Sequence, residues 1–386
     1  MQKTETGYAE LSEKDDRIRW SRSGDRSGPV VILFVGIHGN EPAGVLALDR
    51  VAAAAKEPGL KFHGSVYAIT GNKRALELGV RYLDTDLNRL WESFQAPGEQ
   101  SVFRNETKPA EFEESLEIKQ AIDAIILQHD GIAEELIFAD LHTTSSESCA
   151  FILLNDTLAN RDLARRFPVP QILGIEENIR GTLLSYINNL GYKAIGFEAG
   201  AHQQSLSVDR SAAFIWLLLH YSGVITLEYE QLLSLSEELK ANPQVPDTYF
   251  EILHHKLVDD AETFHMIPGF ENFDPVVKET PLAYERGKLI KAPLDGRIFM
   301  PLYQKKGEDG FLIIREVSEF WLQLSAFMRR SFLHNLLPWL PGVSVESKRS
   351  YRVDLQKARY LVRNVFHLLG YRVTEKDEDT LICYKR

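Results

Sequence analysis

Short apolar runs alternate with longer amphipathic segments between residues 30 and 200. Each run is rich in β-branched and aromatic residues, as is typical of strands buried on both faces of a sheet. The runs lie at residues 30–37, 64–70, 136–141, 150–154 and 194–198. Between them, the pattern favours helices at residues 43–56, 111–129, 158–167 and 181–190. Because strands and helices alternate, we predict an α/β fold with a largely parallel sheet.

The pattern changes near residue 240. The most apolar stretch, residues 212–219 (AAFIWLLL), is shorter than the roughly 18 apolar residues of a membrane span, so we interpret it as a core helix. Residues 239–248 are polar and contain two prolines, which predicts a domain boundary. The chain beyond it has strand-like pieces with frequent turns, then apolar residues at helical spacing from Phe320. A helix at 353–369 and a final hairpin at 371–386 complete the expected elements.

These patterns divide the chain into three predicted parts. Residues 1–240 form an α/β domain, residues 241–330 a smaller β-rich domain, and residues 331–386 a mixed α/β C-terminal extension. The 386 residues are enough for two domains and an appended segment.

Composition narrows the classes of partner. The chain has 44 Lys and Arg against 55 Asp and Glu, a net charge of −11, which argues against a nucleic-acid partner. The two cysteines, Cys149 and Cys383, are too few for a disulfide framework or a cysteine zinc site. The polar, acidic start lacks the pattern of a secretory signal, so we expect a cytoplasmic protein with no membrane partner.

Candidate chemistry begins where the first predicted strand ends, at residues 36–44 (GIHGNEPAG). Ligand sites of α/β sheets lie beyond the carboxyl ends of strands, and His38 and Glu41 stand there. Zinc accepts imidazole and carboxylate ligands and commonly keeps one position for water. The alternative is a turn histidine beside a glutamate that favours the helix macrodipole.

A second motif, DLHTT, ends the run at residues 136–141. Residues i and i+2 of a strand share a face, so Asp140 could accept a hydrogen bond from the second nitrogen of His142. His142 could then be the third metal ligand. The alternative is a polar pair that satisfies local backbone groups.

A third motif, residues 81–89 (RYLDTDLNR), places two arginines and an asparagine close together. Arg81, Asn88 and Arg89 offer donors suited to a carboxylate, and Asp86 could hold Arg89 in place. An exposed charged loop would explain the same run.

Glu198 follows the apolar run AIGF and precedes Ala-Gly. A partly buried carboxylate beside a metal-bound water is a candidate general base, although an ordinary strand-end glutamate is the alternative. His202, four residues further on, is expected near the rim of the same pocket. His254 and His255 are adjacent on a predicted strand and point to opposite faces, so they would not chelate one ion.

Together, the four motifs resemble the succinylglutamate desuccinylase and aspartoacylase family, which belongs with the zinc carboxypeptidases. They occur in the family's order over roughly residues 30 to 200. The resemblance implies a zinc-carboxypeptidase-like, mixed but mostly parallel sheet with flanking helices in a catalytic domain at 1–240. It also implies that the β-rich domain at 241–330 caps the pocket. Residues 331–386 have no counterpart in this resemblance.

The resemblance also implies roles for individual residues. One Zn²⁺ per chain would be held by His38, Glu41 and His142. Glu198 would act as general acid/base, and Arg81 would polarise the scissile carbonyl. The substrate-binding residues would be Asn88, Arg89 and, in the capping domain, Tyr303.

The expected function is a zinc-dependent amide hydrolase, a deacylase that acts on an N-acyl amino acid or a similar small carboxylate. Its partner is then a small anionic substrate. The alternatives are a metallocarboxypeptidase acting on peptides and a catalytically silent binding module of the same fold. A homo-oligomer is an open alternative for the assembly.

Overall fold

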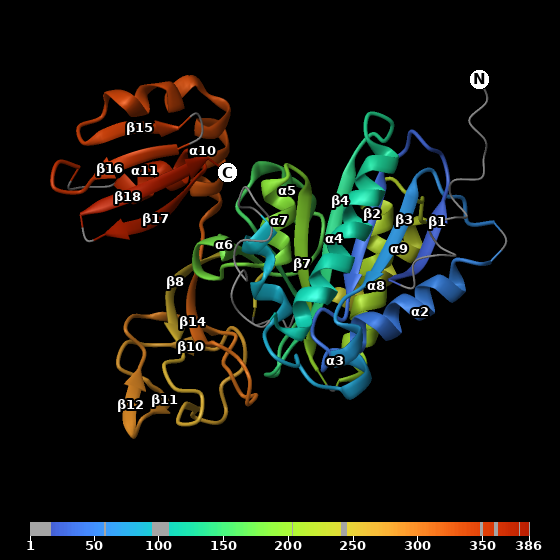
Figure 1. Ribbon diagram of the computed structural model, residues 1–386, viewed down its shortest axis with the longest axis horizontal. Coiled ribbons are helices and arrows are strands. Elements are labelled where there is room, and N and C mark those ends of the chain that lie inside the picture. The colour runs from blue at the N-terminus through green and yellow to red at the C-terminus, as the bar shows by residue number, and fades with distance from the viewer. Residues whose placement is uncertain are drawn as a thin grey trace.

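The computed structural model describes residues 17–57, 59–94, 108–202, 204–240, 245–347, 350–358, 362–377 and 379–385. Across these residues, an 11-stranded sheet runs through the molecule (Figure 1). In spatial order, its strands are β1 (Ile18–Ser23), β3 (Ser65–Thr70), β2 (Val30–Val35), β4 (Leu136–Thr144), β7 (Lys193–Ala201), β5 (Phe151–Leu154), β6 (Gln171–Leu173), β8 (Tyr249–Leu257), β14 (Asp309–Glu316), β13 (Gly296–Phe299) and β10 (Pro275–Val276).

The centre of this sheet confirms the predicted α/β class. β2 pairs in parallel with β3 and β4, and β4 pairs in parallel with β7. β5 runs antiparallel to β7, and β1 runs antiparallel to β3, so the sheet is mixed. Every residue of β2 is buried because both faces of the strand are covered, as its continuous apolar run predicts.

Helices cover both faces of the sheet. Val31, Leu33 and Val35 of β2 pack in one core cluster with α2 (Ala43–Ala54) and α8 (Ser205–Tyr221). The alternate residues Val30, Ile32 and Phe34 pack in another cluster with α4 (Ala110–His129) and α7 (Leu183–Asn189). α8 contains the apolar stretch 212–219 and is the predicted core helix. The shorter or peripheral helices are α3 (Lys73–Leu78), η1 (Leu87–Arg89), η2 (Trp91–Phe94), α5 (Leu158–Ala164), α6 (Ile175–Asn178) and α9 (Tyr229–Leu239).

The region after residue 245 is rich in β structure, but it does not begin a separate sheet. β8 pairs in parallel with β6, and β14, β13 and β10 extend the central sheet beyond β8. A small sheet of β12 (Lys288–Lys291), β11 (Pro281–Glu285) and β9 (His265–Met266) lies beside them. Residues 241–244 of the predicted domain boundary lie outside the described residues.

The last part of the chain forms its own sheet with two helices and a 3₁₀ segment. Its elements are α10 (Glu319–Arg330), η3 (Phe332–Trp339), β15 (Val343–Ser347), β16 (Ser350–Asp354), α11 (Val362–Leu368), β17 (Tyr371–Asp377) and β18 (Thr380–Lys385). The predicted hairpin is β17 and β18. The helix predicted from residue 353 is wrong at its start, because Val353 lies in β16 opposite Leu381 and is buried there. Residues 359–361 of that prediction lie outside the described residues.

None of the described helices combines the length and apolar character needed to cross a membrane.

Candidate metal centre and active site

The central strands bring two of the predicted motifs to one edge of the sheet. β2 and β4 are parallel neighbours with Val35 opposite Leu141, so the turn after β2 lies beside the end of β4. Gly36 leaves β2 with a φ of 71°, a left-handed conformation that glycine adopts without strain. The chain then turns through His38 and Glu41 before α2 begins at Ala43.

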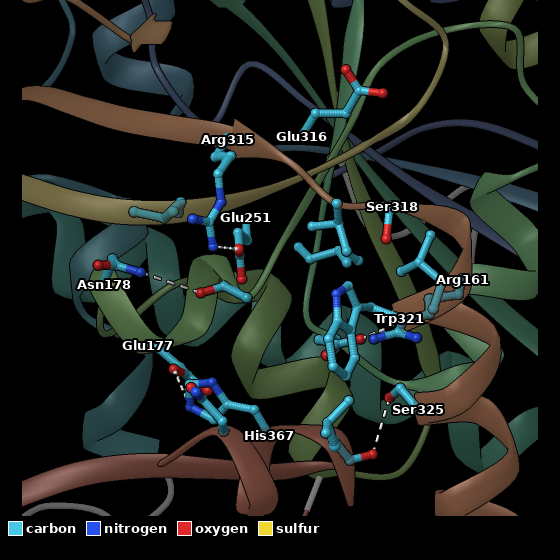
Figure 2. A pocket seen from close by; sticks show the side chains of 18 of the residues that line it. Arg161, Glu177, Asn178, Glu251, Arg315, Glu316, Ser318, Trp321, Ser325 and His367 are labelled. Atoms are coloured by element: carbon cyan, nitrogen blue, oxygen red, sulfur yellow. Dashed lines mark hydrogen bonds and ion pairs between the residues drawn. The ribbon is translucent and has the colours of Figure 1, made fainter. Parts of the chain in front are cut away.

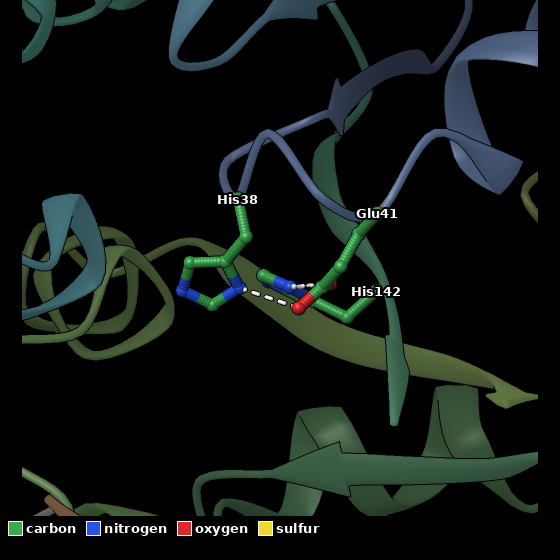
Figure 3. A group of neighbouring side chains, drawn as sticks. All are labelled: His38, Glu41 and His142. Atoms are coloured by element: carbon green, nitrogen blue, oxygen red, sulfur yellow. Dashed lines mark hydrogen bonds and ion pairs between the residues drawn. The ribbon is translucent and has the colours of Figure 1, made fainter. Parts of the chain in front are cut away.

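His38, Glu41 and His142 converge at this edge (Figure 3). One potential ligand atom from each lies within 4.8 Å of the others, and all three residues are buried. Glu41 stands between the two imidazoles: Oε1 is 2.8 Å from His38 Nδ1, and Oε2 is 3.0 Å from His142 Nδ1. The backbone N–H of Thr143 also donates to Glu41 Oε2, at 3.1 Å.

The second nitrogen of each histidine faces another carboxylate. His38 Nε2 is 3.1 Å from Asp86 Oδ1, and His142 Nε2 is 2.8 Å from Asp140 Oδ2. Asp140 thus contacts the second nitrogen of His142, as predicted, but as an ion pair whose geometry is not that of a hydrogen bond. Carboxylates in this position fix the ring orientation of metal-binding histidines and increase their basicity. Both Nδ1 atoms are thereby turned toward Glu41, so the three residues offer ligand atoms to one small region.

Interactions between charged groups shift the pKa values of several residues in the cluster. Burial alone would raise the pKa of Glu41, but His38 and His142 hold it well below its ordinary value. Burial alone would lower the pKa of His142, but Asp140 and Glu41 hold it well above its ordinary value. The pKa of Asp86 is likewise well below its ordinary value, because His38 and Arg81 outweigh its burial. Negative oxygens thus surround the two imidazoles, and this environment suits a cation.

Arg81 closes the cluster on the side of Glu41. Its Nη1 donates to Glu41 Oε1 at 3.3 Å, and its Nη2 donates to Asp86 Oδ2 at 3.0 Å. The buried Nε atom of Arg81 has no hydrogen-bond partner among the described residues. Arg81 therefore bridges Glu41, a candidate ligand, and Asp86, the carboxylate that contacts His38. Its Nε–H is left as a donor that a bound molecule could use.

Glu198 lies on the strand next to His142. The two residues are register partners of β4 and β7, so their side chains project on the same side of the sheet. Glu198 is 4% exposed, and its Oε2 has no hydrogen-bond partner within the described part of the chain. Burial, together with the charges of Glu41 and Asp140, raises the pKa of Glu198 well above its ordinary value.

Asn88 and Arg89 are both engaged within the protein. Asn88 Oδ1 accepts the backbone N–H of Leu183 at 2.8 Å. Arg89 Nη2 pairs with Asp309 Oδ2 of β14 at 2.5 Å, and Asp309 Oδ1 is 2.8 Å from His255 Nε2. Asp86 holds Arg89 through the backbone, as predicted: its side chain caps the 3₁₀ turn Leu87–Arg89, and its carbonyl accepts the N–H of Arg89 at 2.9 Å. The Asp86 carboxylate itself contacts His38 and Arg81 and leaves the Arg89 guanidinium to Asp309.

The loop that carries these residues is fixed by a buried glutamate at the start of α4. Glu111 is fully buried, and its oxygens accept the backbone N–H groups of Leu83, Asp84 and Thr85 at 2.6, 3.2 and 3.1 Å. Asn72 Nδ2 donates a fourth hydrogen bond, at 3.1 Å. This carboxylate therefore determines the path of the chain between Arg81 and Asp86.

A close backbone contact fixes the other end of the loop. Gly181 has a φ of 69°, and a Cβ atom at this position would lie 2.2 Å from the carbonyl oxygen of Arg89. The carbonyl of Gly181 accepts the N–H of Trp91, so the two segments are held together on both sides of the contact. Only glycine fits here without displacing Arg89.

Tyr303 lies at a groove of about 510 Å³ beside the cluster, with Ser145, Ser146 and His202 among the lining residues. The position of His202 agrees with the prediction of a rim residue, and its Nδ1 is 2.7 Å from Thr143 Oγ1. The Tyr303 hydroxyl donates to the carbonyl of Ile267 and accepts the N–H of Phe270. A role for Tyr303 in binding substrate stays a prediction.

Sequence reasoning missed several partners of this site. Asp86 was expected to hold Arg89, but nothing in the motif at residues 81–89 indicated its contact with His38. Asp309 and His255 lie on β14 and β8, far from the motifs in sequence, and only the antiparallel pairing of these strands brings them together. His254 and His255 do point apart, as predicted: the ring of His254 lies 6.2 Å from that of Phe311, tilted by 45°, while His255 contacts Asp309.

The fold and this cluster define an α/β protein with a His–Glu–His site, able to hold a metal, at the carboxyl edge of parallel strands. The model of one protein family, described as "Succinylglutamate desuccinylase/Aspartoacylase catalytic domain", matches residues 27–219, which are half of the chain. The chain belongs to the succinylglutamate desuccinylase/aspartoacylase family.

Individual relatives match over shorter stretches. The chain is 33% identical over 132 residues to an aspartoacylase of Xenopus tropicalis, covering 33% of this chain and 38% of that protein. It is 32% identical over 91 residues to a succinylglutamate desuccinylase of Pseudomonas syringae pv. tomato, covering 21% of this chain and 27% of that protein. The matched stretches thus span well under half of the length of these curated relatives.

Solved structures agree on the fold over a longer part of the chain. A succinylglutamate desuccinylase/aspartoacylase from Rhodobacter sphaeroides superposes with a TM-score of 0.55 at 16% identity, covering 78% of this chain and 88% of that one. A succinylglutamate desuccinylase from Vibrio parahaemolyticus gives 0.54 at 17% identity, covering 77% and 84%.

Proposed function

We propose that this protein is a zinc-dependent amide hydrolase that removes the acyl group from an N-acyl amino acid or a similar small carboxylate. The observation that carries the proposal is a buried carboxylate oxygen, Glu198 Oε2, that has no hydrogen-bond partner among the described residues and lies on the strand next to the His–Glu–His cluster. A glutamate that only satisfied the end of a strand would have a donor to pair with.

The donor set fits zinc. Two imidazole nitrogens and a carboxylate are the ligands of many catalytic zinc sites, in which a fourth position is left for water. The contacts of His38 with Asp86 and of His142 with Asp140 provide the outer carboxylates that such histidines usually have. Zinc, when bound to His38, Glu41 and His142, would lower the pKa of its water and polarise the amide carbonyl.

The chain's own residues then have distinct tasks. Glu198, held by β7 beside His142, accepts a proton from the attacking water and returns it to the leaving amine. Arg81, with Nε free of partners among the described residues, donates to the developing oxyanion. Burial of the whole cluster excludes bulk water and strengthens both interactions.

The substrate's carboxylate is assigned to Asn88 and Arg89. Arg89 already holds the carboxylate of Asp309, which shows that a carboxylate fits its guanidinium. A substrate carboxylate must therefore share Arg89 with Asp309 or displace it. The names of the relatives, an aspartoacylase and a succinylglutamate desuccinylase, indicate N-acylated aspartate and N-succinylated glutamate as the first candidates.

The test is hydrolysis of N-acetylaspartate, N-succinylglutamate and a panel of other N-acyl amino acids, followed by release of free amine. We expect activity on at least one small N-acyl amino acid with the zinc-loaded wild type. The variant Glu198→Gln should lose at least roughly 100-fold in kcat. Glu230→Gln, an exposed glutamate of α9, is the matched control and should keep full activity.

Three outcomes would contradict the proposal. Release of C-terminal residues from peptides, without hydrolysis of N-acyl amino acids, would make the protein a carboxypeptidase. Zinc binding without hydrolysis of either class would make it a silent binding module. Unchanged kcat in Glu198→Gln would remove Glu198 from the chemistry, whichever substrate is cleaved.

A further inference from the structure

The last part of the chain exposes an unusual number of large apolar side chains. We group six of them, five on α10 and η3 and one directly after η3; these two consecutive elements pack against each other. We call them the α10–η3 patch: Phe320, Phe327, Phe332, Leu336, Trp339 and Leu340. Their exposed fractions range from 42% for Leu340 to 85% for Trp339.

The opposite side of α10 packs against the rest of the chain. Leu322 and Ser325 are buried, and the Ser325 hydroxyl donates to the carbonyl of Leu368 in α11. Leu322, Ser325 and Trp321 line a cavity of about 700 Å³ between α10, α11 and the strands β8 and β14 (Figure 2). The helix is therefore apolar on two sides, and folding of this chain buries only one of them.

The patch is large enough for a stable interface. At about 200 Å² for a large apolar side chain, the exposed fractions correspond to an area on the order of 750 Å². The largest apolar patch of a typical monomer is roughly 300–600 Å². A standard protein interface buries about 800 Å² on each partner. One partner could thus cover the whole patch.

The charges on α10 indicate which partner. Glu319 begins the helix and Arg330 ends it. They are eleven residues apart, just over three full turns, so both lie on the same flank of the stripe that contains Phe320 and Phe327. When two such helices pack antiparallel about a two-fold axis, Glu319 of each copy faces Arg330 of the other, at both ends of the contact.

We propose that a second copy of this chain covers the α10–η3 patch, with the two α10 helices antiparallel about a two-fold axis. An anionic membrane surface is disfavoured by the chain's net charge of −11. The placement of Glu319 and Arg330 makes α10 complementary to a second, antiparallel α10. Binding of an unrelated protein would not require this placement. The proposal concerns assembly and is independent of the proposed chemistry.

The first experiment measures mass in solution by light scattering and sedimentation across a range of concentrations. Wild type should have twice the mass of one chain. The double variant Phe327→Glu/Phe332→Glu should become a monomer, with a dissociation constant raised at least about 30-fold. Both positions are largely exposed in the single chain, so its folding should be unaffected. The matched control is Leu127→Glu on α4, which is 79% exposed and lies outside the patch.

The second experiment tests the antiparallel arrangement by charge exchange. Glu319→Arg alone and Arg330→Glu alone should each weaken the dimer, because like charges then meet at both ends. A mixture of the two single variants should form a mixed dimer, since each end again joins an arginine to a glutamate. The double variant Glu319→Arg/Arg330→Glu should recover the wild-type dissociation constant.

Three results would overturn the proposal. The wild type could be a monomer at all concentrations, including one that sediments with anionic phospholipid vesicles. A dimer could persist in Phe327→Glu/Phe332→Glu, which would place the interface elsewhere. Charge exchange could fail to restore the dimer, which would refute the antiparallel arrangement of α10.

Discussion

Replacing Glu111 by glutamine tests how the loop between Arg81 and Arg89 is held. Glu111 is fully buried, and four N–H groups donate to its two oxygens: three from the backbone of residues 83–85 and one from Asn72. Glutamine has the same shape, so the variant creates no cavity. Each oxygen of Glu111 accepts two of these hydrogen bonds. In either orientation of the glutamine amide, its NH2 group therefore replaces one oxygen, and two N–H donors lose their acceptor.

The expected loss of stability follows from these contacts. A buried donor that loses its acceptor costs about 1–3 kcal/mol, and hydrogen bonds to a charged group are at the upper end of that range. With two donors affected, Glu111→Gln should lower the free energy of unfolding by about 2–6 kcal/mol. A neighbouring change, Glu113→Gln, affects a side chain that is 72% exposed and should stay within about 0.5 kcal/mol of wild type.

Urea unfolding followed by tryptophan fluorescence measures the difference in stability. Hydrogen exchange gives a local readout, because the amides of Leu83, Asp84 and Thr85 should lose protection before the amides of β2 do. A loss of stability below about 1 kcal/mol, with unchanged exchange at these three amides, would show that Glu111 does not determine the path of the loop.

Three further predictions concern the same site. Asp140→Asn should weaken zinc binding about 10–100-fold by titration against a chelator, and an unchanged affinity would refute its role behind His142. Gly181→Ala should destabilise the protein more than Gly191→Ala, because only the new Cβ at position 181 meets a backbone oxygen. Gly191 also has a positive φ, but among the described residues no atom beyond its chain neighbours lies within 4 Å of a Cβ built there. Burial alone would raise the pKa of Asp309, but His255 and Arg89 outweigh it and lower that pKa. The ionised Asp309 therefore stabilises the folded protein, and this stabilisation is fully present above the ordinary aspartate pKa. The difference between wild type and Asp309→Asn should therefore shrink as pH falls through that lowered pKa, and a constant difference in urea midpoint would contradict this.

The regular parts of the fold were predictable because their patterns are local. The run VVILFV is buried on both faces in the structure, and α4 covers nearly the residues that its spacing predicts. Val353 shows the limit of this approach. Its apolar neighbours suggest a helix, but pairing with Leu381, nearly 30 residues later, makes it part of a strand.

The site was predictable where the ligands follow strands that the sequence marks clearly. His38, Glu41 and His142 come together because β2 and β4 are parallel neighbours. Asp309 was not predictable, because its contact with Arg89 depends on how β14 extends the central sheet beyond β8. The order of strands in a sheet is a property of the whole chain, and no short motif encodes it.

The central claim is that His38, Glu41 and His142 hold one zinc ion beside Glu198. Elemental analysis of untagged wild type, His142→Ala and Glu198→Gln tests it most directly. We predict about one zinc per chain in wild type and Glu198→Gln, and none in His142→Ala, since a ligand is lost only in the last. Absence of zinc from the wild type, with none taken up when zinc is added, would contradict the claim.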